Sequence, residues 1–289
     1  MTTNKNTLEH IIHGIFLLMG LVAVGCVLLI TVYLVISGIP AILEIGFIDF
    51  LFGKEWASTA TDPKYGIWAF ILTSIYGTAG AIVIGVPIGF MTAVYLSKIA
   101  SPKVKSMMQS AVSLLAGIPS VVYGLVGMLV LVPGIRKIFG VPDGASLLAA
   151  IIVLAIMILP SIIKMSITAL DAVPKEYEDA SLALGATPIE TYFKVSVPAA
   201  KSGIAAAVVL GVGRAIGEAM AVMMVAGNVP NMPDSIFQSV RFLTTAVSSE
   251  MAYSSGLQQQ ALFSIALVLF LFIMLINATL NFFLKRETE

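Results

Sequence analysis

The sequence is poor in charge. Only 11% of its 289 residues are Asp, Glu, Lys or Arg, whereas 58% are hydrophobic, and the mean hydropathy is +1.01. Soluble domains contain about 25% charged residues, so this composition excludes a soluble globular protein and is typical of a chain embedded in a lipid bilayer. Positive and negative charges cancel to a net charge of zero, and this balance indicates no nucleic-acid partner.

Residues that bind metals or nucleotides are also scarce. Cys26 is the single cysteine, which excludes an intrachain disulfide and a cysteine-based metal site. His10 and His13 are the only histidines, so we expect no metal centre. The sequence has no glycine-rich loop followed by Lys and Ser or Thr, and no paired nucleophile and base. We therefore expect a chain that is not an enzyme and that binds neither ATP nor another cofactor itself.

Long apolar runs dominate what is present. A transmembrane helix needs about 20 apolar residues, and six stretches of the sequence are long enough. They are Ile11–Ser37, Gly66–Ser97, Ser106–Val132, Ala145–Ile163, Ser202–Gly227 and Leu262–Leu284. The first run is too long for the core of a signal peptide, so we interpret it as an uncleaved span. The pattern predicts an all-α polytopic membrane protein with six transmembrane helices.

The basic residues predict how these spans are oriented. If the N-terminus is cytoplasmic, ten of the sixteen lysines and arginines lie on the cytoplasmic side, five lie outside and Arg214 lies within the membrane. Cytoplasmic segments carry an excess of basic residues, so both termini are expected in the cytoplasm. Arg136 and Lys137 lie on the outer side and oppose this trend.

Residues 174–203 form a polar segment between two long apolar runs. Pro174 suits a first helical position, and Gly185 stands where a helix would end in a left-handed residue. Thr187 and Glu190 have the spacing of a capping box, which would start a second short helix. The first helix then has one face made of Tyr177, Ala180, Ser181 and Leu184. An ordinary amphipathic loop fits this pattern as well as a docking element for a soluble partner does.

The same segment resembles the cytoplasmic loop of ABC importer permeases. In that family the loop reads Glu-Ala-Ala, three residues, Gly, nine residues, then Ile-x-Leu-Pro. This chain has Asp179-Ala180-Ser181, Gly185 and Val195-Ser196-Val197-Pro198 at those spacings. The resemblance implies that this coupling loop seats in a groove of an ATP-binding subunit. The residues it implies for that contact are Glu178, Asp179, Ala180, Gly185 and Pro198.

The fifth predicted span carries the only charges inside the membrane. Arg214 and Glu218 are four residues apart, so on one continuous helix they share a face. A charge at this depth costs roughly 2.5–3.5 kcal/mol, and ionisable residues there usually have a function. The planar fork of Arg214 suits the oxygens of an anion, and the Glu218 carboxylate can neutralise the arginine or accept a proton, so the two are candidates for a substrate gate. A buried ion pair that only holds helices together is the alternative.

Ser120 is a third candidate for the substrate path. It follows Pro119 in the middle of the third predicted span. A proline there frees a backbone carbonyl, which is tolerated where the site is buried in protein or lines a cavity.

Two outer segments carry short helical patterns. Ile42, Leu43 and Ile45 predict a short surface helix followed by a looser stretch. Ser235 can cap a second helix that continues to Val247 with an apolar face. We expect this second helix to lie on the membrane face or over the mouth of a path, with Arg241 facing water.

The segment Gly213-Arg214-Ala215-Ile216-Gly217-Glu218-Ala219-Met220-Ala221-Val222 resembles the C permease subunits of phosphate (Pst-type) ABC importers, in which threonine stands at the position of Ala219. The likeness covers about Leu8 to Leu284. It implies the type I ABC importer permease fold, with residues 1–65 as an N-terminal transmembrane anchor and extracytoplasmic segment and residues 66–284 as the permease domain. It also implies a heterodimer with a paralogous A permease subunit, two ATP-binding subunits and an extracytoplasmic phosphate-binding protein.

The expected function is therefore that of a multi-pass cell-membrane subunit that passes inorganic phosphate to the cytoplasm. A permease for another oxyanion, such as molybdate or sulfate, would keep the coupling loop and lose the arginine–glutamate pair. An ion channel or secondary transporter would need no ATPase dock, and the spacing of Asp179, Gly185 and Pro198 argues against it.

Overall fold

Helices make up most of the fold in the computed structural model, which describes residues 3–286. Five helical stretches are long and apolar enough to cross a membrane: Ile12–Ile45, Trp68–Ile99, Ser120–Phe139, Leu147–Asp171 and Gly256–Thr279. Pro188–Ala199 and Lys201–Gly217, which meet at 72°, make a sixth if the bent pair is one span. The predicted all-α polytopic fold is confirmed.

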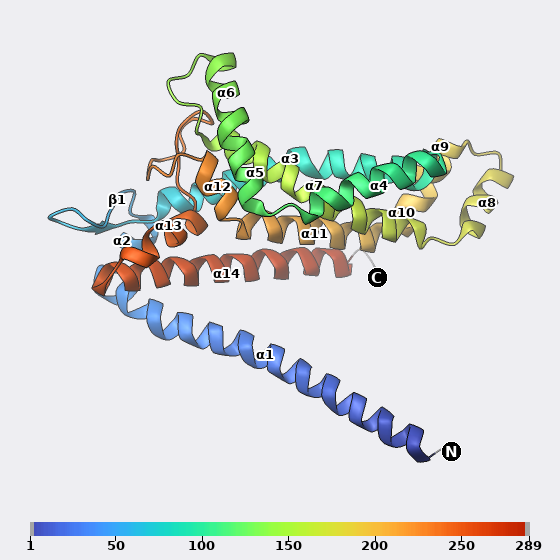
Figure 1. The fold of residues 1–289 in the computed structure, drawn as a ribbon, viewed down its shortest axis with the longest axis horizontal. Coiled ribbons are helices and arrows are strands. Elements are labelled where there is room, and N and C mark those ends of the chain that lie inside the picture. The colour runs from blue at the N-terminus through green and yellow to red at the C-terminus, as the bar shows by residue number, and fades with distance from the viewer. Residues whose placement is uncertain (1–2, 287–289) are drawn as a thin grey trace.

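The long helices of the bundle run roughly along the longest axis of the molecule (Figure 1). One end carries the short helices α8 (Lys175–Ala183) and α9 (Pro188–Thr191), and we call it the loop end. The opposite end carries the antiparallel strands β1 (Trp56–Ala57) and β2 (Lys64–Tyr65), and we call it the hairpin end. The first and last long helices both direct their chain-terminal ends toward the loop end (Figure 1).

The first helix lies mostly outside the bundle. α1 (Thr3–Ile45) diverges from the other helices toward its N-terminal end, and its apolar side chains are exposed over much of its length (Figure 1). Near its other end it packs on α14 (Gly256–Arg286), where the rings of Tyr33 and Phe263 meet edge to face with their centroids 5.4 Å apart. Such an exposed apolar helix requires lipid or another protein around it.

α7 (Leu147–Asp171) is the central helix. It packs along α3 (Trp68–Val94) and α11 (Lys201–Gly217). The close approach to α3 depends on a glycine, because a Cβ added at Gly85 would lie 2.6 Å from the Ile158 side chain. Small residues at helix contacts are the usual means of tight packing in membranes, where van der Waals contact replaces the hydrophobic effect.

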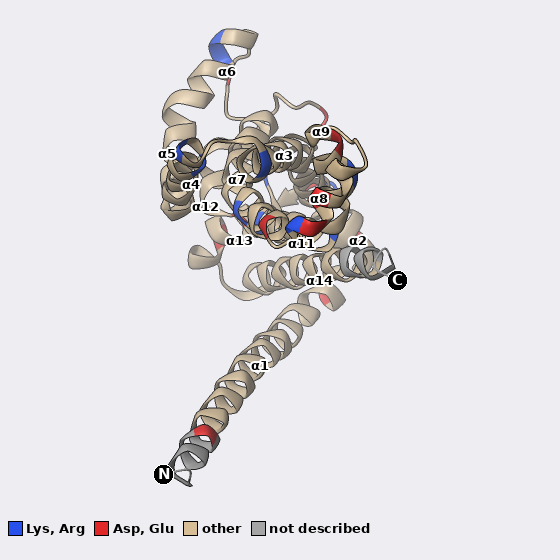
Figure 2. Cartoon of the chain, turned by 90° about the vertical axis from the view of Figure 1, so that its right-hand side faces the viewer, with Lys and Arg blue, Asp and Glu red and all other residues tan. Residues whose placement is uncertain are grey.

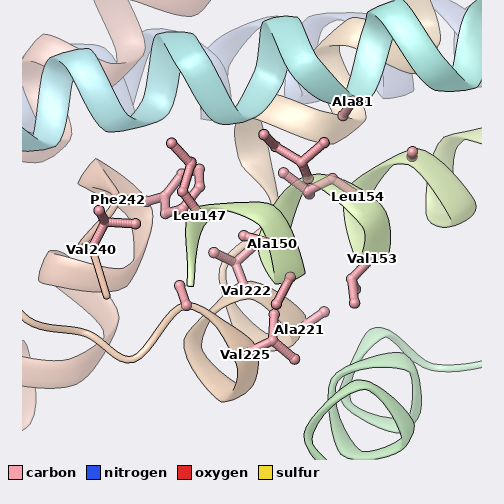
Figure 3. Close-up of a cluster of buried hydrophobic side chains, with 14 of the residues drawn as sticks. Ala81, Leu147, Ala150, Val153, Leu154, Ala221, Val222, Val225, Val240 and Phe242 are labelled. Carbon is pink, nitrogen blue, oxygen red and sulfur yellow. The ribbon is translucent and has the colours of Figure 1, made fainter. Parts of the chain in front are cut away.

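The largest apolar cluster joins α7 to the short helix α12 (Met220–Val225). Figure 3 shows side chains from both helices meeting those of α3 and of the segment before residue 243. The labelled members are Ala81, Leu147, Ala150, Val153, Leu154, Ala221, Val222, Val225, Val240 and Phe242. This cluster fixes α12 against the centre of the bundle.

The third predicted span, Ser106–Val132, is divided rather than continuous. Its parts are α4 (Pro102–Gly117), α5 (Ser120–Val126), the π-helix η2 (Gly127–Leu131) and α6 (Val132–Phe139). The break falls at Pro119, which has no N–H to continue the ladder of α4. The Leu115 carbonyl near the end of α4 accepts from the N–H of Ile118 at 3.2 Å and from the Tyr123 hydroxyl at 2.7 Å, which connects the two sides of the break.

At the hairpin end, α2 (Phe47–Phe52) directly follows α1, so Ile42, Leu43 and Ile45 belong to the end of α1 instead of a separate helix. The helix predicted from Ser235 is wrong in its start, because α13 spans Leu243–Glu250 and the 3₁₀ turn η4 (Met251–Tyr253) follows.

Residues 235–242 supply hydrogen-bond acceptors to the start of α7. The N-terminal N–H groups of α7 are buried and need acceptors. The N–H groups of Leu147 and Leu148 donate to the carbonyls of Gln238 and Ile236 at 3.1 and 2.7 Å. The backbone of this segment therefore caps α7, which explains why it does not form the predicted helix.

The polar segment folds as predicted at the loop end. Gly185 ends α8 with a φ of +88°, and Thr187 and Glu190 form the capping box that starts α9. The π-helix η3 (Tyr192–Ser196) and α10 (Val197–Ala199) lead on to α11. A second π-helix, η1 (Tyr95–Ile99), ends α3.

α5 and α12 cross so closely that Gly124 has no room for a side chain. A Cβ there would lie 2.9 Å from the Cα of Ala221 and 3.1 Å from its carbonyl oxygen. We expect Gly124→Ala to push the two backbones apart and to destabilise the fold by about 1–3 kcal/mol. The measurement is the midpoint of thermal unfolding in detergent.

The matched control is Gly134→Ala in α6, where an added methyl group meets nothing within 4 Å. It should leave the midpoint unchanged or raise it, because alanine favours a helix over glycine. Equal losses in both variants would contradict the close crossing.

Candidate substrate path and coupling surface

Arg214 and Glu218 do not lie on one continuous helix, because α11 ends between them. α11 ends at Gly217, and Glu218 has extended backbone angles (φ −74°, ψ 127°). Its Oε1 accepts a hydrogen bond from the N–H of Ala221 at 3.1 Å, which caps α12, and its carbonyl accepts one from the Thr244 hydroxyl at 2.8 Å. Among the ion pairs of residues 3–286, none joins Arg214 to Glu218.

Arg214 instead lies in a cavity between three long helices. It is half-buried in the last turn of α11, and its Nη1 donates to the Ser161 hydroxyl of α7 at 3.3 Å. The cavity has a volume of about 680 Å³. Its lining consists of Ser161, Met165, Ala206, Val209, Leu210, Gly213, Arg214 and Asn277. The guanidinium is its only charged group, so the lining is positive and suits an anion.

Ser161 and Asn277 were missed by the sequence analysis. Both are polar side chains within long apolar stretches of α7 and α14, and that contrast was the available signal. A hydroxyl and a primary amide each donate and accept hydrogen bonds. Together with the arginine fork they supply the cavity with polar groups from three helices.

Ser120 does not line this cavity. It is the first residue of α5, directly after the break at Pro119 and one turn before the close crossing at Gly124. Its assignment to a substrate path stays a prediction.

The loop end gathers charged and exposed residues. Figure 2 views the molecule from this end and shows acidic and basic residues around α8 and α9, whereas α1 and α14 carry few. α8 has no fully buried residue, and Asp179, Ala180, Gly185 and Pro198 are exposed. Leu184 is 90% exposed. Tyr177 of the same helix and Ile189 of α9 are exposed as well. An apolar surface of this kind on a polar tip fits a protein partner.

Ser181 and Glu178 differ from their neighbours on α8, because both turn inward. The Ser181 hydroxyl contacts that of Thr191 at 2.9 Å, so Ser181 does not belong to the exposed apolar face predicted for it. Glu178 binds Lys98 of η1 and Ser196 of η3. Whether Glu178 also contributes to the predicted contact with an ATP-binding subunit stays a prediction.

The pKa of Glu178 reflects these contacts. Burial alone raises it, but the hydrogen bonds from Lys98 and Ser196 and the charges of Lys98 and Lys175 outweigh burial and lower the pKa below its ordinary value of 4.5. Because the pKa is lowered in the fold, the ionised carboxylate stabilises the fold at pH values above 4.5. This stabilisation is lost as the pH falls through the lowered pKa. The Glu178 carboxylate is thus ionised at neutral pH.

Arg241 does not face water, and that prediction was wrong. It pairs with Glu250, and its Nε donates to the carbonyl of Asn228 at 2.9 Å. The same carboxylate accepts hydrogen bonds from the indole of Trp56 at 3.2 Å, the hydroxyl of Ser58 at 3.1 Å and the amide of Gln258 at 3.1 Å. We call these residues the Glu250 cluster. It joins the hairpin, α13 and the start of α14.

The chain has the features of a polytopic membrane transport protein. Its long helices can span a bilayer, an arginine lies in a cavity between them, and a polar helix–turn–helix lies at one end. The chain belongs to the family of binding-protein-dependent transport system inner membrane components, whose sequence model matches residues 85–287. It is therefore a multi-pass membrane protein and a permease subunit of an ABC importer.

Three relatives illustrate the likeness. The probable ABC transporter permease protein YqgH of Bacillus subtilis is 41% identical over 266 residues, which cover 89% of this chain and 86% of the relative. The phosphate transport system permease protein PstC of Pasteurella multocida is 33% identical over 242 residues, covering 77% and 75%. A bacterial alginate ABC transporter, solved in complex with a periplasmic protein bound to an alginate pentasaccharide, has a TM-score of 0.61 at 17% identity, covering 95% and 94%.

The Glu250 cluster generates a stability prediction. Glu250→Gln leaves the partly buried charge of Arg241 unpaired, whose side chain is 15% exposed. We expect a loss of about 1–3 kcal/mol in unfolding free energy, because an uncompensated charge is costly when it is partly removed from water. The midpoint of thermal unfolding in detergent measures it.

The matched control is Glu55→Gln. Glu55 pairs with Lys64 at 2.5 Å on the surface, where the two side chains are 68% and 55% exposed. Surface pairs contribute little, so its midpoint should stay near that of the unsubstituted protein. An equal effect of both substitutions would contradict the burial argument.

Proposed function

We propose that this chain passes inorganic phosphate across the membrane, from an extracytoplasmic binding protein to the cytoplasm, in a complex driven by ATP-binding subunits. The single observation that carries the proposal is the cavity in which Arg214 contacts Ser161, which Asn277 also lines and whose lining contains no carboxylate. Relatives named as phosphate transport system permeases, such as the one of Pasteurella multocida, support the choice of phosphate.

The chemistry of the cavity favours hydrogen phosphate over sulfate. The arginine fork suits two oxygens of either anion. Hydrogen phosphate also carries a proton that needs an acceptor, and the oxygens of Ser161 and Asn277 can provide one. Sulfate has no proton to donate, so the same two groups can meet it only as hydrogen-bond donors. We assign this role to Ser161 and Asn277, since the Glu218 side chain caps α12 and lies outside the cavity lining.

The exposed parts of the structure support two kinds of partner. The apolar residues at the tip of α8 and α9 fit a groove of an ATP-binding subunit, two copies of which would serve a permease dimer. The exposed α1 and an apolar groove of about 540 Å³ along α5, α6 and α7 fit a second, paralogous permease subunit. We also propose that residues 66–284 form the permease domain and that residues 1–65 act as its N-terminal anchor and outer segment.

Radiolabelled phosphate uptake by the assembled complex tests the path. We expect Arg214→Gln to lower uptake by about 10–100-fold, because one charge-assisted hydrogen bond contributes about 1.5–3 kcal/mol. Ser161→Ala and Asn277→Leu should give smaller losses and should weaken the preference for phosphate over sulfate in competition.

The matched control for the arginine is Arg136→Gln, since Arg136 is exposed on α6 and outside the cavity. Its uptake should match that of the unsubstituted protein. If Arg214→Gln assembles and carries phosphate at the full rate, the cavity is not the path. If molybdate or sulfate is carried in place of phosphate, the substrate is another oxyanion.

Orientation is a separate prediction, with the loop end and both termini in the cytoplasm. In a Cys26→Ala background, cysteines replacing the exposed Thr61 and Ser255 at the hairpin end should react with an impermeant thiol reagent added to intact cells. A cysteine replacing the exposed Ser101 should react only after permeabilisation. The reverse labelling pattern would overturn the orientation.

A further inference from the structure

α8 is the first helix of the predicted coupling loop, and we call it the coupling helix. It is held by polar contacts instead of apolar packing. None of its residues is fully buried. Glu178, in the middle of α8, accepts a hydrogen bond from Lys98 Nζ at 2.5 Å and another from Ser196 Oγ at 2.8 Å. The Lys98 and Glu178 side chains are only 10% and 19% exposed, so solvent screens their attraction less than that of a surface pair.

These two partners belong to different parts of the bundle. Lys98 lies in η1, which ends α3, and Ser196 lies in η3, which leads through α10 into α11. α11 carries Arg214 at its other end. One carboxylate thus joins the coupling helix both to the long helix α3 and to the helix that holds the intramembrane arginine.

The neighbouring residue of η1 makes a second contact of the same kind. The Ser97 hydroxyl donates to Asp171 at 2.6 Å, and Lys105 Nζ donates to the other oxygen of that carboxylate at 2.8 Å. Asp171 is the last residue of α7. Consecutive residues of η1 therefore hold the end of α7 and the middle of α8. Both η1 and η3 are π-helical, a geometry that occurs often at functional positions.

The backbone by itself does not connect α8 rigidly to the bundle. Pro174 precedes α8 with a ψ of 135°, and Gly185 follows it with a φ of +88°, so no helix continues through either end. A displacement of α8 reaches the long helices as a rigid movement only through its side-chain contacts.

We propose that the contact of Lys98, Glu178 and Ser196 transmits movement of the coupling helix to α3 and α11, and that Glu178 is a positioning residue for transport. This inference rests on the proposed docking of an ATP-binding subunit at the loop end. It does not depend on which anion is carried.

The test uses the full complex with its ATP-binding subunits in proteoliposomes. ATP hydrolysis and uptake of radiolabelled phosphate are measured on the same preparation. Glu178→Gln and Lys98→Met each remove one charge and keep most of the side-chain volume. Both should leave ATP hydrolysis within about twofold of the unsubstituted complex and should lower uptake per ATP by about tenfold, a typical size for coupling between sites.

The charge-swapped double variant, Lys98→Glu with Glu178→Lys, should recover much of the lost uptake per ATP. Lys103→Met is the matched control, since Lys103 is an exposed lysine of the neighbouring α4, and its uptake per ATP should be unchanged. A contact that only stabilises the fold would instead lower complex yield, hydrolysis and uptake together.

Three results would decide against these inferences. Unchanged uptake per ATP in both single variants overturns the role of the contact. A parallel loss of yield, hydrolysis and uptake reduces the contact to a stabilising one and overturns it too. Failure of the unsubstituted chain to co-purify with ATP-binding subunits contradicts the proposed function instead.

Discussion

A lipid bilayer leaves no water to pair with a free backbone group, so a break in a helix needs polar partners from the protein itself. At Pro119 the Tyr123 hydroxyl pairs with the Leu115 carbonyl beside the break. At Glu218 the carboxylate receives the N–H of Ala221, and Thr244 donates to the carbonyl. Each break is therefore supported by a polar side chain close by.

α11 is held by polar contacts near both of its ends. At the loop end, η3 before it is bound through Ser196 to Glu178 of the coupling helix. Just beyond its other end, Thr244 of α13 is bound to Glu218, and α13 itself ends at Glu250 in the cluster of the hairpin end. Arg214 lies between these two contacts. The helix that carries Arg214 is thus connected through hydrogen bonds to both ends of the molecule.

Local signals were read correctly where the partners lie close in sequence. The capping box of Thr187 and Glu190 and the turn at Gly185 depend on a few neighbouring residues, and both have the predicted form. The same reasoning failed for the segment that begins at Ser235. Its capping signal was real, yet the buried N-terminus of α7 takes the carbonyls of Ile236 and Gln238. The need of the α7 N-terminus for hydrogen-bond acceptors outweighed the local preference of this segment for a helix.

The sequence by itself determined most of the membrane-spanning stretches, the polar loop and the family resemblance, because bilayer thickness and short-range hydrogen bonds act on continuous runs of residues. The third span, which breaks at Pro119, is the exception. Only the tertiary structure decided which side chains meet. Arg214 contacts Ser161, which lies 53 residues away, and leaves Glu218, four residues away, to cap another helix. Arg241 turns from water to Glu250. Such contacts depend on how the helices are rotated and where they break, and the packing of neighbouring helices sets both.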